Sequence, residues 1–559
     1  MNKISKKKAA SITLALAISS TTLLAACASD KEKTDTATTT PGAASTAAAS
    51  AKPAGPKPKI TVSIYDRNNV PEGEGTITNN RWTKWINDNA PVQVEFIPVP
   101  RTNSSEKWNV LFASGQAPDL IMEFSNPYMK DLASKGQIIP LDDAISKYST
   151  NYKKVITGNE SLQKLTRFNG KTYFFGRTLP FATNHYVMIR QDWLDKLKLP
   201  MPKTTEEYLQ VAKAFTEQDP DGNGKKDTLG STFFDVDYFF QLGQASDETL
   251  PMITSYHLIN DQYVRTWDRP KSDLAFKKAL YDAGTVDKDT FTDKNGAKAQ
   301  QDWVNGKLGI WGAGGLEGAA TGYDVYNTLM KNNPTAKVAI LPLPKSEFGQ
   351  FSPAGAVPMQ FMSAINATAK NVEAVVKYVD WLMTPEVQQT LMYGIEGVNY
   401  KMVDGCPKPI DPEKNKKELN WNGDFQMMSQ TGTMGKCVDY TNQLDPSKPN
   451  DKAYIDLVKQ GREAYITPDR PTTSEIVLPI TLTDDLTVIK NTLKNTLTNI
   501  YTKAVVGGSG YTVDQAMKDA QEAWEKGGGK KVDDFYTKAY ADNKKDVIYT
   551  KDYYKLLTK

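Results

Sequence analysis

The chain has 559 residues, which allows two to four domains at about 100–200 residues per domain. It is 39% hydrophobic, and 68 Lys and Arg against 65 Asp and Glu give a net charge of +3, which argues against nucleic-acid binding through bulk charge. Mean hydropathy is −0.50, which excludes a multi-pass membrane protein, and two His in the whole chain argue against haem and His-rich zinc sites.

Residues 1–26 have the pattern of a secretory signal peptide. Four Lys precede the moderately apolar run Ala9–Thr22, and Leu24-Ala25-Ala26 stands directly before Cys27. The sequence Leu-Ala-Ala-Cys resembles the lipobox of bacterial lipoproteins, which implies that Cys27 is diacylated and becomes the new N-terminus. The alternative is an ordinary signal peptide followed by a chance Cys.

Residues 27–58 are predicted to be a disordered tether. They are mostly Ala, Thr, Ser, Pro and Lys and contain no large apolar residue that could build a core. A flexible segment of this length has an r.m.s. span of ~30 Å. Loss of residues 1–26 removes four Lys and leaves 64 basic against 65 acidic residues. We therefore do not expect long-range charge to capture the ligand.

The body begins with three β-branched or alternating segments that predict strands, at Lys59–Tyr65, Val92–Pro98 and Asp119–Phe124. Helices are predicted between them, at Trp82–Asn89 and Trp108–Ala113. This alternation favours a parallel sheet in an α/β layer, whose ligands bind beyond the carboxyl ends of the strands. The segments expected at that edge are Tyr65-Asp66-Arg67 and Glu123-Phe124-Ser125.

The same alternation continues along the chain. Further strands are predicted at Tyr186–Arg190 and Lys337–Pro342, and Thr204-Thr-Glu-Glu207 is a capping box that begins a helix. An amphipathic helix is predicted at Asn371–Met383, and Pro385 lies in the first turn of the next one. The last hundred residues predict helices at Leu486–Val506, Val513–Glu525 and Asp533–Ala541.

Several motifs, in this order and spacing, resemble the family 1 extracellular solute-binding proteins of ABC importers, and among them the large lipoproteins of Gram-positive bacteria. The similarity runs from about residue 60 to the C-terminus. The motifs are Gly170-Lys-Thr-Tyr-Phe-Phe-Gly176, Tyr186-Val-Met-Ile-Arg190, Asp219-Pro-Asp-Gly-Asn-Gly224, Trp303-Val-Asn-Gly-Lys307, Val379-Asp-Trp-Leu382 and Tyr393-Gly-Ile-Glu-Gly-Val-Asn-Tyr400.

The resemblance implies a two-lobed, periplasmic-binding-protein-like α/β fold, in which each lobe is a sheet flanked by helices and the ligand binds in a cleft between the lobes. It assigns residues 59–180 and 340–400 to lobe 1, and residues 181–339 and 401–559 to lobe 2. The crossover segments are then expected near Leu179–Tyr186, Ala336–Leu341 and Asn399–Val403. Closure by hinge motion would follow.

The implied function is that of a lipid-anchored receptor on the outer face of the cell membrane. It would act as a monomer, bind a solute, which we expect to be an oligosaccharide, and deliver it to an ABC permease without catalysis. No P-loop, Gly-x-Ser-x-Gly elbow or His-Glu-x-x-His motif occurs, and His185 and His257 stand alone. The alternatives are a secreted glycan-degrading enzyme and a ligand-binding partner of a membrane sensor.

Residues 219–228 predict a structural Ca²⁺ site. Oxygen-bearing side chains fall at positions 1, 3, 5 and 9 of an EF-hand-like loop, and Gly224 occupies position 6, where the chain must turn sharply. Gly230 replaces the usual Glu at position 12, and the family resemblance places the last ligand at Thr228 instead. The alternative is a solvated turn. The predicted ligands are Asp219, Asp221, Asn223, Lys225 through its carbonyl, Asp227 and Thr228.

A saccharide site needs aromatic rings for the apolar face of the sugar and polar groups around its edge. Each candidate also has a structural alternative: Arg190 can pair with Asp192 or Asp195, and Glu396 can brace a turn. Cys406 and Cys437 form either one disulfide or two separate buried thiols. The candidate ligand-binding residues are Phe124, Tyr128, Arg190, Trp311 with the small residues Gly312–Gly315, Glu396, Asn399 and Tyr400.

Overall fold

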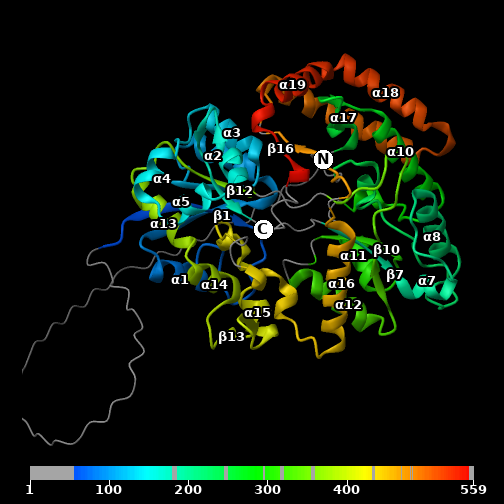
Figure 1. Ribbon diagram of the computed structural model, residues 1–559, viewed down its shortest axis with the longest axis horizontal. Coiled ribbons are helices and arrows are strands. Elements are labelled where there is room, and N and C mark those ends of the chain that lie inside the picture. Colours follow the sequence, from blue (N-terminus) through cyan, green and yellow to red (C-terminus); the bar gives the residue numbers. More distant parts are fainter. Residues whose placement is uncertain are drawn as a thin grey trace, which may run out of the picture. The chain divides into compact units, whose positions relative to one another are not determined.

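The structure is a computed structural model, shown as a ribbon in Figure 1. No helix of the described residues is both long and apolar enough to cross a membrane. The signal-like segment, the tether and Cys27 lie outside the described part of the chain. The described residues are 56–178, 185–243, 250–293, 296–314, 316, 320–353, 359–430, 435–467, 469–478, 480 and 482–552.

The first sheet has five strands in the order β2-β1-β3-β12-β6. As the sequence predicts, β1 (Lys59–Asp66) pairs in parallel with β2 (Gln93–Pro100) and β3 (Leu120–Glu123). The other two strands, β12 (Met359–Ile365) and β6 (Phe175–Thr178), are antiparallel to their neighbours. The sheet is therefore mixed, and β12 comes from a segment far along the chain.

The helices around this sheet agree with prediction where a prediction was made. Helices α1 (Arg81–Asn89) and α2 (Ser104–Ala113) follow the first two strands. Helix α13 (Val372–Leu382) packs its apolar face on the sheet and is followed by α14 (Pro385–Tyr393). The remaining helices here are α3 (Asn126–Ser134), α4 (Asp142–Tyr148), α5 (Asn151–Thr157) and α6 (Glu160–Leu165).

The first hydrophobic core lies against this sheet and includes a segment around Trp421 that the sequence predicts in the second lobe. The side chains of Leu419, Trp421 and Phe425 pack in this core together with β1 and β3. The Trp82 indole also donates a 2.8 Å hydrogen bond to Glu418 O. This part of 401–559 therefore packs with the first sheet, whereas the lobe assignment predicts it in the second lobe. The other lobe boundaries stay predictions.

The second sheet has three strands and is entirely antiparallel, whereas the sequence pattern suggested another parallel layer. Strand β7 (His185–Arg190) lies between β10 (Ile310–Gly314) and β11 (Val338–Ile340). The helices that pack in or beside the second core are α7 (Gln191–Leu197), α8 (Thr205–Glu217), α10 (Asp268–Asp282), α11 (Ala297–Val304), α12 (Ala320–Asn332) and α16 (Pro449–Tyr465).

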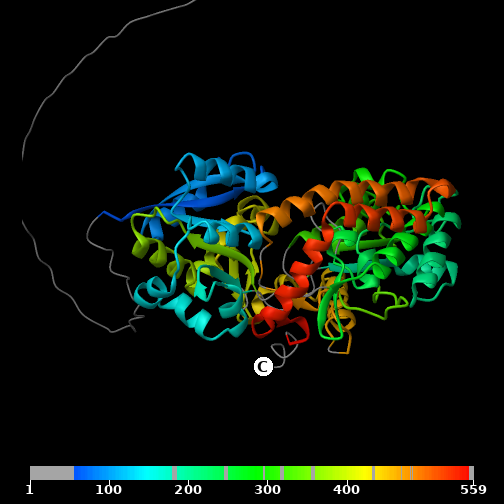
Figure 2. The ribbon, with the colours of Figure 1, turned by 90° about the horizontal axis from the view of Figure 1, so that it is seen from above.

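Three C-terminal helices form a layer with α10 and build a third core. They are α17 (Asp484–Val506), α18 (Val513–Lys526) and α19 (Gly529–Asp542), close to the predicted ranges. Figure 2 shows α17 and α18 running side by side, in orange and red. The Leu493, Leu497 and Trp524 side chains are buried between these helices.

Short strand pairs and one disulfide complete the fold. Cys406 and Cys437 are bonded, so the disulfide alternative is confirmed. Cys406 begins β14 (Cys406–Pro409), which pairs with β13 (Tyr400–Val403). The other short elements are β4 (Arg167–Phe168), β5 (Lys171–Thr172), α9 (Pro251–Thr254), β8 (Tyr256–Ile259), β9 (Gln262–Arg265), α15 (Pro412–Glu418), β15 (Ile476–Val477) and β16 (Ile548–Tyr549).

Candidate functional site

An aromatic cluster lies where the parallel strands β1 and β3 end, as the strand order predicts. The rings of Tyr65 and Phe124 are stacked, with centroids 5.7 Å apart and planes within 9°. The Arg101 guanidinium lies 5.1 Å from the centroid of each ring, and it forms no ion pair with any described residue. A cation held over two aromatic rings offers hydrogen-bond donors beside an apolar face.

The Glu123 carboxylate holds the residues of this cluster in position through hydrogen bonds. It accepts hydrogen bonds from the Tyr65 hydroxyl at 2.5 Å and from the Trp108 indole at 2.8 Å, and from the backbone N–H groups of Phe124 and Ser125. Burial and the neighbouring Glu123 carboxylate raise the pKa of Tyr65. Four donors saturate this buried carboxylate, so its role is to position Tyr65 and Phe124.

Tyr128 lies in the first turn of α3, close to this cluster in sequence. Ser125 caps the helix by accepting the Tyr128 backbone N–H, and the Tyr128 hydroxyl donates to Asn109 Oδ1 at 3.4 Å. Arg67, which follows β1, makes a two-fold ion pair with Asp424 at 2.7 and 2.9 Å. The first-sheet cluster therefore combines the buried ring of Tyr65 and the half-buried ring of Phe124 with Arg and Tyr side chains.

A second cluster surrounds Trp311 on β10. The Trp311 ring stacks on the buried Trp303, with centroids 5.5 Å apart. The next residue, Gly312, has no room for a side chain, because a Cβ there would lie 2.3 Å from a carboxylate oxygen of Asp235. Trp311 and Phe124 belong to different hydrophobic cores.

Asp235 is a site candidate that our sequence prediction missed. It is fully buried at φ +68°, and neither carboxylate oxygen has a hydrogen-bond partner among the described residues. The His185 ring lies within ion-pair distance, with Nδ1 3.6 Å from Oδ1. Burial raises the pKa of Asp235 well above its ordinary value, and the Asp237 carboxylate raises it further. Phe234, 36% exposed, lies against His185. The feature of the sequence that could have pointed to Asp235 is its position within the aromatic segment 233–240.

Arg190 has the structural role that was its alternative interpretation. Its guanidinium makes two hydrogen bonds to Asp192, at 2.9 and 2.6 Å, and lies 4.6 Å from the centroid of the Trp193 ring. The same Asp192 accepts the Lys337 backbone N–H. Arg190 thus joins β7 to the beginning of α7 and is not grouped with Phe124 or Trp311.

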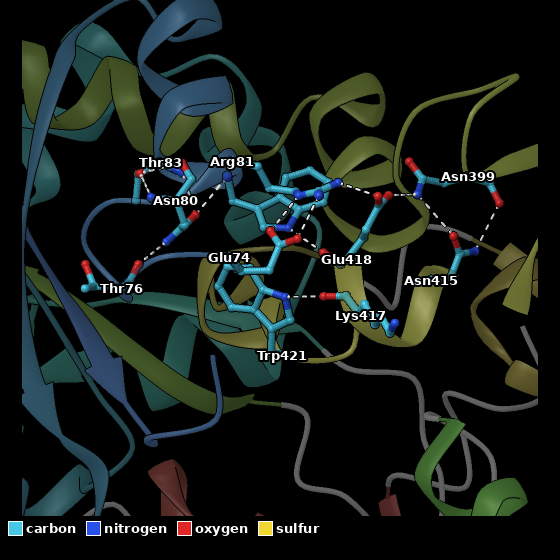
Figure 3. Close-up of polar contacts among 11 residues, drawn as sticks. Glu74, Thr76, Asn80, Arg81, Thr83, Asn399, Asn415, Lys417, Glu418 and Trp421 are labelled. Atoms are coloured by element: carbon cyan, nitrogen blue, oxygen red, sulfur yellow. Dashed lines mark hydrogen bonds and ion pairs between the residues drawn. The ribbon is translucent and has the colours of Figure 1, made fainter. Parts of the chain in front are cut away.

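Asn399 and Tyr400 are also held in structural contacts. Asn399 Nδ2 donates to Glu418 at 2.8 Å, and Glu418 pairs with Arg81 at 2.8 Å (Figure 3). The Tyr400 hydroxyl accepts a hydrogen bond from Gln389 at 2.6 Å. Both residues are buried, whereas Glu396 in the same turn is exposed. The polar contacts in Figure 3 therefore fix the turn before β13 to α1 and α15.

The loop at 219–228 has the oxygen-rich composition that a hard cation requires. Asn223 Nδ2 lies between carboxylate oxygens of Asp221 and Asp227, at 2.7 and 3.0 Å. Asp219 accepts the backbone N–H groups of three loop residues. Burial and the Asp219 carboxyl raise the pKa of Asp221. A cation would relieve the repulsion among these carboxylates, so the donor set fits Ca²⁺ in its chemistry.

Three further details describe this loop. The Thr228 hydroxyl is buried and donates to Phe215 O at 2.8 Å, so its side chain does not reach the loop oxygens. Within the described residues, no three Asp, Glu, His or Cys side chains form a ready metal-binding group. Lys225 donates its backbone N–H to Asn223 Oδ1 at 2.7 Å.

The sequence model of the protein family described as bacterial extracellular solute-binding protein matches residues 77–389, which is more than half of the chain. The chain belongs to this family. The solute-binding protein is 26% identical over 467 residues to the lipoprotein LipO of Bacillus subtilis, which covers 80% of this chain and 86% of LipO. It is also 26% identical over 397 residues to the polygalacturonan/rhamnogalacturonan-binding protein YtcQ of B. subtilis, covering 69% and 76%.

Two solved structures share the fold of this solute-binding protein. FusA from S. pneumoniae, an ABC-transporter substrate-binding protein in complex with kestose, matches with a TM-score of 0.66 and 20% identity over 87% of this chain and all of FusA. The alginate-binding protein AlgQ2 without calcium ion matches with a TM-score of 0.64 and 20% identity, covering 87% and 99%. These matches confirm the periplasmic-binding-protein-like fold class. The first predicted crossover, apart from His185 and Tyr186, lies outside the described residues.

Proposed function

We propose that this solute-binding protein captures an oligosaccharide outside the cell and delivers it to an ABC importer. Family membership is the observation that carries the proposal, and two proteins named above, YtcQ and FusA, are described with oligo- or polysaccharide ligands. The two clusters supply the chemistry that saccharides need. Phe124, stacked on the buried Tyr65, and Trp311 supply aromatic rings, Arg101 has no ion pair with any described residue, and the Asp235 carboxylate has no hydrogen-bond partner among them.

The proposal includes a lipid anchor at Cys27 and a position on the extracellular face of the membrane. Its support is the Leu-Ala-Ala-Cys sequence and the similarity to a protein named as a lipoprotein. Two acyl chains hold a protein durably on a bilayer, whereas one chain binds only marginally. The tether would then keep a monomeric body close to the permease.

We also propose that Ca²⁺ stabilises the loop at 219–228 without touching the solute. The ligands would be the side chains of Asp219, Asp221, Asn223 and Asp227 and the carbonyl of Lys225. The oxygen-rich loop supports this, as does the fold shared with a protein described in a form without calcium ion. A loop closed by protein oxygens supplies rigidity and leaves little room for a substrate.

The test is a thermal-shift assay of the full chain against a glycan panel with Ca²⁺ present. A ligand at about 100 times its Kd adds ~2.7 kcal/mol of stability, which raises Tm by a measurable amount. Trp311→Ala should remove the shift. Trp381→Ala, which alters a tryptophan packed on Tyr378 and Trp85, should retain it.

Recovery of the glycan separates binding from catalysis. An intact glycan after overnight incubation is the result expected of a receptor, whereas new reducing ends would establish the glycan-degrading alternative. A panel without any shift would contradict the saccharide proposal. The sensor alternative is tested in cells, where deletion of the gene should abolish uptake of the glycan that produces the shift.

A further inference from the structure

A cavity of about 850 Å³ shares no lining residue with the two clusters described above. It is bounded by α3, by α6 and the turn between β4 and β5, and by α19 with the residues that follow it. This volume falls within the range of ~300–1,000 Å³ that is usual for small-molecule sites. None of the predicted site residues lines it.

Lys130 on α3 is a buried cation without a partner in this cavity. Its residue is only 6% exposed, and it has no hydrogen bond or ion pair with any described residue. Burial lowers the pKa of Lys130 to about 8, and no neighbouring charge contributes to that shift. A buried ammonium group usually has a paired carboxylate, because the desolvation of an isolated charge is costly.

Further cations line the same cavity. Arg167 on β4 and Lys545 after α19 have no ion pair within the described chain. Two other lysines, Lys164 and Lys538, are paired within their own helices. Asp546 is the single cavity-lining carboxylate of the described residues that has no ion pair. The unpaired groups therefore leave the cavity with a positive surplus, which favours an anionic ligand.

The remaining lining groups are those of a saccharide site. The side chains of Phe168 on β4 and Phe535 on α19 both line the cavity. The amide of Asn169, at φ +48° in the β4–β5 turn, stands beside Phe168 in sequence and also lines the cavity. Ring faces suit the apolar faces of pyranose rings, and an amide group suits hydroxyl groups. A small inorganic anion would use neither.

We propose that this cavity binds a carboxylate-bearing saccharide, with Lys130 and Arg167 holding the carboxylate and Phe168 and Phe535 contacting the sugar rings. This inference rests on the proposed function: it adds this cavity to the two clusters as a part of the region that binds the solute, and it names the solute class as acidic. An ammonium and a guanidinium bind a carboxylate through charge-assisted hydrogen bonds, which are about twice as strong as neutral ones. The carboxylate of the ligand would be the counter-charge that Lys130 does not have among the described residues.

The experiment is isothermal titration calorimetry of the purified full chain with two matched trisaccharides. α-1,4-Linked trigalacturonate carries a carboxylate on each ring, and α-1,4-linked galactotriose carries a hydroxymethyl group in its place. Inorganic phosphate is the third probe. We expect trigalacturonate to bind at least about 10-fold more tightly than galactotriose, and to weaken as salt rises, because each charge-assisted bond contributes about that factor.

The variants assign the effect to this cavity. Lys130→Met keeps an unbranched side chain that is one atom shorter and removes its charge, and should weaken trigalacturonate binding by about 10- to 100-fold while leaving galactotriose unchanged. Arg167→Gln, at an exposed position, should weaken it by a smaller factor. Lys538→Met is the matched control, because Lys538 lines the same cavity but is paired with Asp542.

Equal affinities for the two trisaccharides, or an unchanged preference in Lys130→Met, would overturn the inference. Binding of phosphate alone, lost in Lys130→Met, would also overturn it and make the cavity an inorganic-anion site. Failure of the proposed function looks different, since then no glycan of the neutral or acidic panel shifts Tm. A neutral glycan that binds without any acid preference leaves the proposed function intact and removes only the acidic class.

Discussion

Two lysines in this molecule are almost equally buried but differ in what surrounds them. Lys277 on α10 lies between the carboxylates of Asp237 and Asp273, the second at 3.2 Å, and the Tyr501 hydroxyl donates to Asp273 at 2.6 Å. Lys130 on α3 has no such partner among the described residues. Lys277 thus joins the second core to α17, whereas Lys130 faces a cavity. Burial alone therefore does not identify a binding residue, and the missing partner does.

Removing Lys277 should have the largest effect. Lys277→Met leaves two buried carboxylates without a counter-charge, and loss of one member of a buried ion pair costs about 3–5 kcal/mol of unfolding free energy. Urea denaturation measures this value. Lys271→Met, at a surface pair with Asp514, is the control and should change stability by less than about 1 kcal/mol. Similar losses of unfolding free energy in both variants would mean that the buried ion pair contributes no more to stability than the surface pair.

Removing the charge of Lys130 should have the opposite effect and raise the unfolding free energy. Its folded-state pKa is about 8 against 10.5 for the free side chain, so the unfolded chain binds the proton more tightly and the charge destabilises the fold below pH 8. Lys130→Met should therefore raise the unfolding free energy by about 3 kcal/mol at pH 7. The gain should fall to about 1 kcal/mol at pH 9.5, as the folded wild-type protein loses the proton.

Urea denaturation at these two pH values checks the prediction for Lys130. A destabilised Lys130→Met variant would show that the ammonium is already compensated in the free protein. Together with the calorimetry proposed above, a gain in stability accompanied by a loss of affinity would mark a residue kept for binding at the expense of the fold.

The loop at 219–228 is a third case, in which carboxylates rather than a cation lack a counter-charge. Chelation should lower Tm, because Ca²⁺ at about ten times its Kd contributes ~1.4 kcal/mol. Asp219→Ala should make Tm insensitive to both chelator and Ca²⁺. Asp411→Ala, at the cap of α15 outside the loop, should leave the chelator response unchanged. A wild-type Tm that does not respond to chelation would exclude the site.

The sequence predicted the elements better than their assembly. The alternation in Lys59–Tyr65 and the Pro in the first turn of α14 are local signals, and the structure has both elements close to the predicted positions. The antiparallel second sheet and the packing of Trp421 in the first core depend on residues far apart in the chain. No local pattern records such pairings.

The site shows the same division. Phe124 could be placed beside Tyr65 because parallel strands end at a common edge, and that contact is present. Asn399 and Tyr400 look like ligand-binding residues in sequence, yet their partners Glu418 and Gln389 hold them in the fold. Lys130 carries no signal at all, because the neighbouring residues of α3 would suit any half-exposed helix.

The position of β12 in the first sheet affects how this protein can be made. Strand β3 pairs on one side with β1 and on its other edge with β12, which comes from Met359–Ile365. A chain synthesised from its N-terminus must therefore keep the apolar segment Leu120–Glu123 from pairing with other chains until most of the protein has emerged. Fragments that end before residue 359 should aggregate, and a chaperone that shields this edge of β3 would raise the yield of folded protein.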